Sequence, residues 1–76
     1  MSCHELNFTL ENIRRAKETI KVVINDLDRV YRVIENDNIQ VCIIMLKNIL
    51  YQLVQREITI VYELYNRGCM KVEDNA

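Results

Sequence analysis

Residues 37–68 read DNIQVCIIMLKNILYQLVQREITIVYELYNRG, without a proline, and they end on the only glycine of the chain, Gly68. Glycine adopts the left-handed conformation that ends many helices, so Gly68 is a predicted stop signal. Asp37 and Gln40 have capping-box spacing, which predicts Asp37 as the N-cap. We expect one helix from about residue 38 to 67, roughly 45 Å long at 1.5 Å per residue.

The apolar surface of this predicted helix is unusually wide. On a helical projection its polar residues fall on one narrow strip, and the apolar arc covers about 220°, whereas a surface helix shows a stripe of somewhat over 100°. One neighbouring helix cannot cover such an arc, so at least two are expected. The predicted oligomer or partner interface consists of Ile43, Leu46, Leu50, Leu53, Val54, Val61, Leu64 and Tyr65.

A strand interpretation competes, because the region is rich in Ile and Val and residues 58–63 partly alternate between apolar and polar. Two strands would require a turn between them. The interior of the stretch has no Gly, Pro or Asn-Gly pair to form one. We therefore predict a helix.

A second amphipathic helix is predicted at about residues 5–35, with a start at Ser2, where Glu5 completes a capping box, or at Thr9. Fraying is expected before Thr9. Its apolar residues alternate at spacings of three and four, which is a heptad seam. That seam is Ile13, Ala16, Ile20, Val23, Leu27, Val30 and Ile34.

The predicted break between the helices is the run Glu35-Asn36-Asp37-Asn38. Asparagine tolerates the left-handed conformation and aspartate caps the next helix, so the helices should fold back through a turn at 36–38. The result is an all-α antiparallel hairpin forming a single domain, 1–76, with a flexible tail at 69–76.

Seventy-six residues, half of them hydrophobic, form a small domain that buries only about 60% of its unfolded surface. Such chains usually gain stability by oligomerising. We predict a dimeric four-helix bundle, which resembles in architecture alone the small dimeric hairpin bundles that regulate plasmid copy number.

Net charge and cysteine usage narrow the expected environment. A net charge of −1 gives no general attraction to nucleic acid or acidic membranes. The longest apolar run, residues 41–46, is far below the roughly 20 residues of a membrane span, and no signal-peptide pattern is seen. Three cysteines without CxxC spacing favour a reducing compartment, so a cytoplasmic location is expected.

Glu57 lies near the middle of the predicted apolar arc, where an unpaired carboxylate is unfavourable. In the hairpin it comes level with Lys17, and we predict a structural Glu57–Lys17 pair with Arg14 as the alternate partner. The open alternatives are a basic residue of another subunit and, least favoured, a catalytic or metal-binding role.

The chain ends bring Cys3, His4 and Cys69 together in the predicted hairpin. Three interpretations stay open: free thiols, which are favoured, a Cys3–Cys69 disulfide, and a zinc site completed by a second subunit. Cys42, on the apolar face, is interpreted as a small core residue. No metal and no cofactor are predicted.

Function is predicted only in class. With no glycine-rich loop, Ser/His/Asp set or HExxH motif, no enzyme is predicted. The expectation is a homo-oligomeric protein–protein interaction module, such as a regulator or inhibitory subunit, that docks a partner through apolar helix faces. The alternative is a nucleic-acid-associated regulator using a basic face, Arg14, Arg15, Lys21, Arg29 and Arg32.

Overall fold

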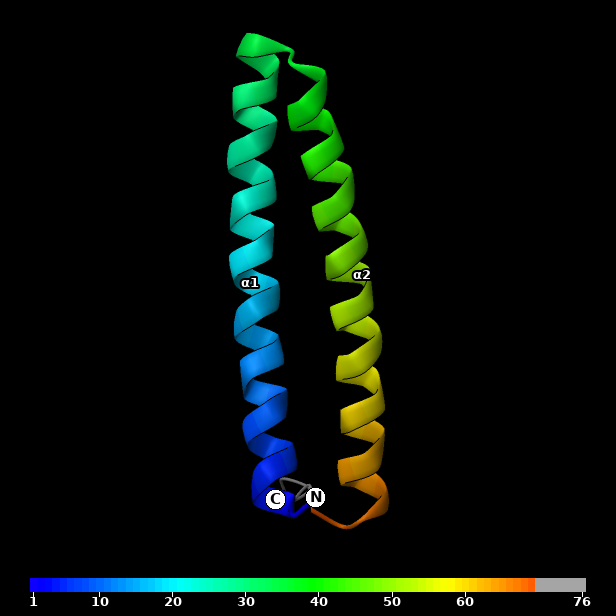
Figure 1. The fold of residues 1–76 in the computed structure, drawn as a ribbon. Helices are drawn as coiled ribbons and strands as arrows, with labels where there is room; N and C mark the ends of the chain where they lie inside the picture. Colours follow the sequence, from blue (N-terminus) through cyan, green and yellow to red (C-terminus); the bar gives the residue numbers. More distant parts are fainter. Residues whose placement is uncertain (70–76) are drawn as a thin grey trace, which may run out of the picture.

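The protein is a hairpin of two long antiparallel helices. A computed structural model describes residues 1–69, in which α1 spans Cys3–Ile34 and α2 spans Asp37–Asn66. Figure 1 shows the two helices side by side along their whole length, with the turn at one end and the described chain ends at the other. The predicted all-helical hairpin is confirmed, and residues 58–63 lie within α2 rather than in a strand. Of the flexible tail predicted at 69–76, Cys69 is described and bonded to Cys3, and residues 70–76 lie outside the described residues.

The first helix begins at the earlier of its two predicted starts. The Glu5 backbone N–H donates to Ser2 Oγ at 3.1 Å, and the Ser2 backbone N–H donates to Glu5 Oε1 at 2.8 Å. This capping box satisfies two N–H groups that a helix start leaves unpaired. The hydrogen bond from the Ser2 backbone also lowers the pKa of Glu5. Residues 3–8 are therefore helical, against the fraying expected before Thr9.

The turn uses different residues from those predicted. Glu35, not an asparagine, takes the left-handed conformation, with φ 55°, and its N–H donates to the Tyr31 carbonyl at 2.7 Å. The N-cap of α2 is Asn36, whose side-chain oxygen accepts from Asn38 N–H at 2.8 Å, and Asp37 stands in the first turn. The helix begins at Asp37, one residue before its predicted start. Asn36 is then the N-cap, because its backbone is extended and its side-chain oxygen can accept from the first turn.

The end of α2 follows the prediction for Gly68. Its φ is 73°, and its N–H donates to the Tyr65 carbonyl at 3.1 Å while Cys69 N–H reaches the Leu64 carbonyl at 2.9 Å. These bonds satisfy carbonyls that the last helical turn would otherwise leave free. The chain then turns towards the start of α1.

The two helices meet along seams with heptad spacing. Residues at the same level have numbers adding to 71 or 72, as the contacts Cys3–Cys69 and Tyr31–Gln40 show. Only four of the described side chains are buried in the core, namely Leu6, Leu10, Ile43 and Leu64. The seam of α1 is Leu6, Leu10, Ile13, Lys17, Ile20, Ile24, Leu27 and Tyr31, and that of α2 is Ile39, Ile43, Leu46, Leu50, Leu53, Glu57, Ile60 and Leu64.

The seam predicted for α1 differs from the one that faces α2. The two share Ile13, Ile20 and Leu27, but Val23 and Val30 flank the contact and are exposed. The physical reason is that α1 carries two overlapping heptad patterns, one position apart, and α2 covers only one of them. The residues that belong to the second pattern alone, among them Val23 and Val30, lie beside the contact with α2 and not in it.

Candidate functional site: an ion triad and two apolar faces

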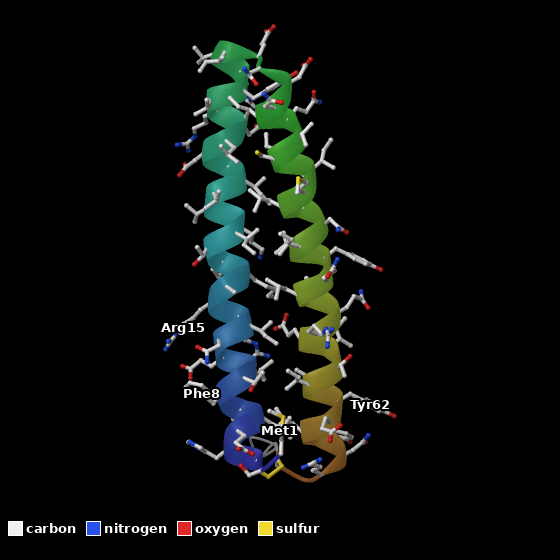
Figure 2. All side chains as sticks on the ribbon, viewed as in Figure 1. Met1, Phe8, Arg15 and Tyr62 are labelled. Carbon is white, nitrogen blue, oxygen red and sulfur yellow. A yellow bond between two sulfur atoms is a disulfide. The ribbon has the colours of Figure 1, made fainter. Side chains whose placement is uncertain are left out.

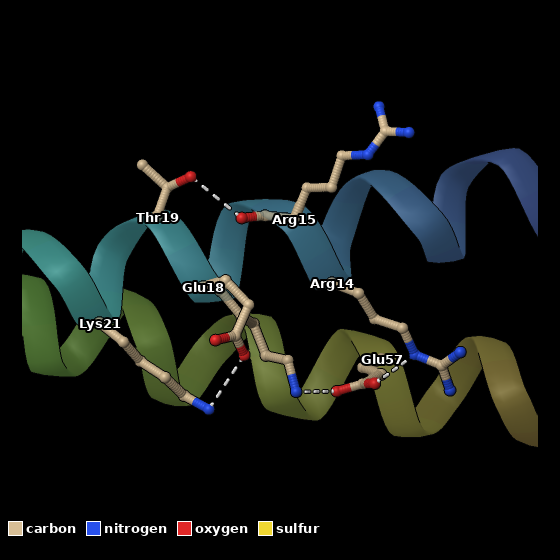
Figure 3. Close-up of polar contacts among 7 residues, drawn as sticks. Arg14, Arg15, Glu18, Thr19, Lys21 and Glu57 are labelled. Atoms are coloured by element: carbon tan, nitrogen blue, oxygen red, sulfur yellow. Dashed lines mark hydrogen bonds and ion pairs between the residues drawn. The ribbon is translucent and has the colours of Figure 1, made fainter.

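Glu57 of α2 holds two basic side chains of α1. Glu57 Oε2 accepts from Arg14 Nε at 2.8 Å, and Glu57 Oε1 pairs with the Lys17 ammonium. Figure 3 shows the carboxylate reaching across to α1, with dashed lines to both bases. The structure thus brings together the two residues of the predicted pair and adds Arg14, which was expected only as an alternate. We call Arg14, Lys17 and Glu57 the ion triad.

Lys17 and Glu57 occupy seam positions and Arg14 flanks the seam, so the ion triad interrupts an otherwise apolar contact. The side chains of Lys17 and Glu57 are 17% and 16% exposed, whereas Arg14 is 55% exposed. Hydrogen bonds from Lys17 and then Arg14 hold the pKa of Glu57 below its usual value. The carboxylate is therefore ionised at neutral pH and has both oxygens occupied. This is the geometry of the structural pair predicted from the sequence, in which a polar seam group favours one register of the two helices.

A disulfide between Cys3 and Cys69 joins the two described ends of the hairpin. This corrects the expectation of free thiols, and the reason is geometric: the hairpin brings the two Cα atoms to 5.5 Å, within the usual range for a disulfide. Stable disulfides form mainly in oxidising compartments, so the cysteine count no longer supports a cytoplasmic location. Cys42 is the free cysteine and is exposed, which corrects its interpretation as a core residue.

The zinc alternative at the chain ends loses two ligands to this bond, since a disulfide sulfur is not a thiolate. Within residues 1–69, no group of three or more His, Cys, Asp and Glu side chains is placed to hold a metal ion. Neither α1 nor α2 carries a stretch both long and apolar enough to cross a bilayer.

Most of the predicted basic face is paired with acids. Besides Arg14 in the ion triad, Arg15 contacts Glu11 at 3.2 Å, Lys21 contacts Glu18 at 3.3 Å, and Arg32 contacts Asp28 at 3.1 Å. Figure 2 shows Arg15 pointing away from α2, and Arg29 lies a further four turns along the same side of the helix. Exposed pairs of this kind are weak, but they offset positive charge that phosphates would need.

The predicted interface residues of α2 fall into two groups. Ile43 and Leu64 are buried against α1, and Leu46, Leu50 and Leu53 are half-buried in the same seam. These five are already engaged within the hairpin, so a second molecule would meet at most their outer edges. The residues turned further from the seam are Val54, Val61 and Tyr65.

The flat sides of the hairpin differ in charge. At about 100° per residue, Arg14 and Lys21 flank the α1 seam on the side of the ion triad, whereas Val23 and Val30 flank it on the other side. In α2, Val54 and Val61 lie on the ion-triad side. We call the uncharged part of the opposite side the neutral face; Arg56 and Glu63 border it towards the chain ends. Its residues are Ile13, Ala16, Ile20, Val23, Leu27, Val30, Cys42, Leu46, Ile49 and Leu53.

A shallow groove of about 430 Å³ lies at the chain-end half of α2 on the ion-triad side. Glu57 borders it, and its other lining residues are Ile58, Val61, Tyr62 and Tyr65. The tyrosines are exposed, and Figure 2 shows Tyr62 pointing away from α1. The wide apolar arc predicted for α2 therefore serves two purposes: part of it packs on α1 and part forms this tyrosine groove.

Sequence reasoning missed the neutral face as a surface, although its signal was present. Ala16, Val23 and Val30 belong to the seam predicted from heptad spacing, whereas the observed seam runs through Lys17 and Glu57. The predicted Glu57–Lys17 pair was the signal for this second seam.

Comparisons of the chain with protein-family models, with curated protein sequences and with solved structures find no match.

Proposed function

We propose that the protein is a protein–protein interaction module that acts as a dimeric four-helix bundle and regulates a partner by docking to it. The observation that carries this proposal is the mismatch between core and surface. Four buried side chains stand against fifteen large exposed hydrophobic ones among the described residues. A core of that size supplies little stability, and small helical chains gain the remainder by association.

The neutral face supports self-association. Protein interfaces are depleted in charged residues at their centre. The neutral face has apolar or small side chains on both helices, and its seam residues Ile13, Ile20, Leu27, Leu46 and Leu53 are only half-buried in the single hairpin. Covering them with two further helices gives the arrangement of a four-helix bundle.

The tyrosine groove supports docking of a partner. Tyrosine is enriched at protein interfaces because one ring offers apolar area and a polar tip. The groove and the neutral face lie on opposite sides of the hairpin, so a dimer formed through the neutral face would leave the groove open. A regulator needs both surfaces: one for assembly and one for recognition.

Two neighbouring valines provide a matched test of the assembly. Val23, 39% exposed, lies on the neutral face, and Val22, 57% exposed, points away from it. Val23→Glu should convert dimers to monomers, because it places a charge in the interface, whereas Val22→Glu should leave the mass unchanged. Light scattering on both variants measures this. Equal masses for the two variants would contradict the proposal.

Two tyrosines provide the corresponding test of docking. Tyr62 lines the groove, whereas Tyr51 is similarly exposed on α2 but lies outside it. Binding of a native partner, recovered with the unmodified chain, should weaken with Tyr62→Ser and persist with Tyr51→Ser. Equal retention by both variants would show that the groove is not used.

The basic-face alternative, a nucleic-acid regulator, has less support, since four of its five bases are paired with acids. It predicts salt-sensitive retention on heparin, with a steep loss between low and moderate salt. The proposed interaction module should pass through heparin without retention.

A further inference from the structure

The neutral face is continuous with the hairpin's own core. Its seam residues Ile20 and Leu46 touch the contact between α1 and α2 with one side and face outward with the other. Val23 and Ile49, which flank the seam, stand at the same level of the hairpin because their numbers add to 72. The same holds for Val30 and Cys42. The face is therefore made of matched layers, each with one residue from α1 and one from α2.

These layers change in character from the turn to the chain ends. In the turn half the flanking residues Val23, Val30, Cys42 and Ile49 are apolar, and Asp26 is the only charge on that side of residues 19–34 and 37–53. In the chain-end half the flanking residues are Thr9 and Ala16 on α1 and the charged Arg56 and Glu63 on α2. Further from the seam on the same side lie four polar residues, Glu5, Asn12, Thr59 and Asn66.

A second copy can cover the neutral face in two symmetric ways. Closed dimers have a two-fold axis, which here lies either perpendicular or parallel to the helices. A perpendicular axis turns the copy end over end, so the apolar turn half meets the polar chain-end half. Val30 would then lie against Glu5 of the second copy, and Met45 against Glu63, which buries carboxylates without partners.

A parallel axis keeps every layer at its own level. Val23 then faces Ile49 of the second copy, and Val30 faces Cys42. At the polar end, the small side chain of Ala16 leaves room for Arg56 of the second copy, and Thr9 faces Glu63. Apolar layers meet apolar layers. Arg56, near the middle of the hairpin, lies beside the small Ala16, and Glu63 lies closer to the chain ends.

We propose that a second copy of the chain docks on the neutral face about a two-fold axis parallel to the helices, so that α1 of each copy packs against α2 of the other. This rests on the proposed dimeric function and adds to it the face, the axis and the register. The two turns then lie at one end of the bundle and the two disulfides at the other. The tyrosine groove of each copy stays on the outside.

The exposed Cys42 allows the register to be tested by cross-linking. With a parallel axis, Val30→Cys lies opposite Cys42 of the second copy, so oxidised glutathione should join the two into a covalent dimer. Within one hairpin the two residues sit on neighbouring helices and both point outward, so they do not reach each other. Val22→Cys, on the outward side of α1, is the matched control. We expect roughly tenfold more covalent dimer from Val30→Cys, since disulfides require close and oriented Cβ atoms.

The perpendicular axis makes a different prediction. In the register that pairs Met45 with Glu63, it would place Asn66→Cys opposite Cys42 of the second copy. A shift of one heptad would place Thr59→Cys there instead. Non-reducing gels and peptide mapping of the new bond distinguish the cases. Cross-linking from Thr59→Cys or Asn66→Cys but not Val30→Cys overturns the parallel axis, as does a dimer that cross-links from none of them. A purely monomeric chain in the same samples instead overturns the proposed function itself.

Discussion

The two halves of the hairpin are stabilised in different ways. The chain-end half is closed on itself: Leu6, Leu10 and Leu64 form its buried cluster, the Cys3–Cys69 bond joins its ends, and the ion triad fixes its register. The turn half has Ile43 as its one buried side chain among residues 19–53. Its exposed hydrophobic residues include Val22, Val23, Val30, Val33, Ile34, Val41, Ile44, Met45 and Ile49.

In the proposed dimer, this difference separates a half that is closed on itself from a half that a second copy would cover. A half that has its own covalent bond, core and ion pairs keeps its shape alone. A half held by one turn and half-buried seam residues has less stabilisation of its own, and the proposed dimer would supply the remainder. The predictions below compare the halves directly, and each is measured at one fixed protein concentration because dimer stability depends on concentration.

The largest effect is expected from the disulfide in the chain-end half. Replacing Cys3 and Cys69 together by serine should lower the free energy of unfolding by about 4 kcal/mol. The bond joins residues that are 66 positions apart in sequence, so it reduces the conformational entropy of the unfolded chain. Urea unfolding measures the loss. Cys42→Ser is the control and should leave stability nearly unchanged. A double variant as stable as the control would mean that the bond does not hold the hairpin.

The next effect comes from the buried leucine of the same half. Leu64 is fully buried, so Leu64→Ala should cost about 3 kcal/mol for lost burial and the cavity left behind. Leu50 is a half-buried seam leucine of the turn half, and Leu50→Ala should cost clearly less in a monomer. Comparing the two variants in urea at low concentration sharpens the contrast between the halves. Equal losses would contradict it.

The ion triad should make stability depend on pH. Glu57→Gln removes the charge that Lys17 and Arg14 share, with an expected loss of about 2 kcal/mol at neutral pH, typical of hydrogen bonds to charged groups. The folded pKa of Glu57 is lowered, so its contribution is present above the unfolded value near 4.5 and is lost as pH falls through the folded pKa.

The measurement is the melting temperature of both proteins from pH 7 to pH 2. The gap between the unmodified chain and Glu57→Gln should be constant at neutral pH and should narrow below pH 4.5. The capping carboxylate Glu5 is present in both proteins and cancels in the comparison. A gap that does not narrow would remove the ion triad from the account.

The smallest effects are expected at the two left-handed residues, which form a matched pair. Glu35, with φ 55°, bears a side chain where glycine is favoured, so Glu35→Gly should stabilise by about 1 kcal/mol. Gly68, with φ 73°, already has the favoured residue, and Gly68→Ala should destabilise by about the same amount although nothing lies within 4 Å of the added Cβ. Thermal melts of both variants should shift in opposite directions; shifts of the same sign would contradict this.

Much of this architecture could be predicted from the residues. The stop at Gly68, the capping box at Ser2 and the pairing of Glu57 with Lys17 each follow from spacing and local chemistry. The turn residues could not be predicted, because four polar residues in a row, 35–38, offer several caps of similar energy. Glu35 takes the left-handed position and Asn36 the N-cap because α2 begins at Asp37, one residue before its predicted start.

The two surfaces were harder to recognise for a physical reason. A helix with two overlapping heptad patterns does not reveal which one its covalent neighbour covers, and Ile13, Ile20 and Leu27 belong to both. The disulfide posed a similar problem, since two cysteines 66 residues apart become neighbours only once the hairpin is formed. In both cases tertiary arrangement decides between local possibilities of similar merit.

The mass of the unmodified chain in solution tests the central claim most directly. Sedimentation equilibrium over a hundredfold range of concentration should give about 18 kDa, twice the 9.1 kDa of one chain, with dissociation only at the lowest concentrations. A well-folded species of 9.1 kDa at every concentration would show that the hairpin needs no neighbour.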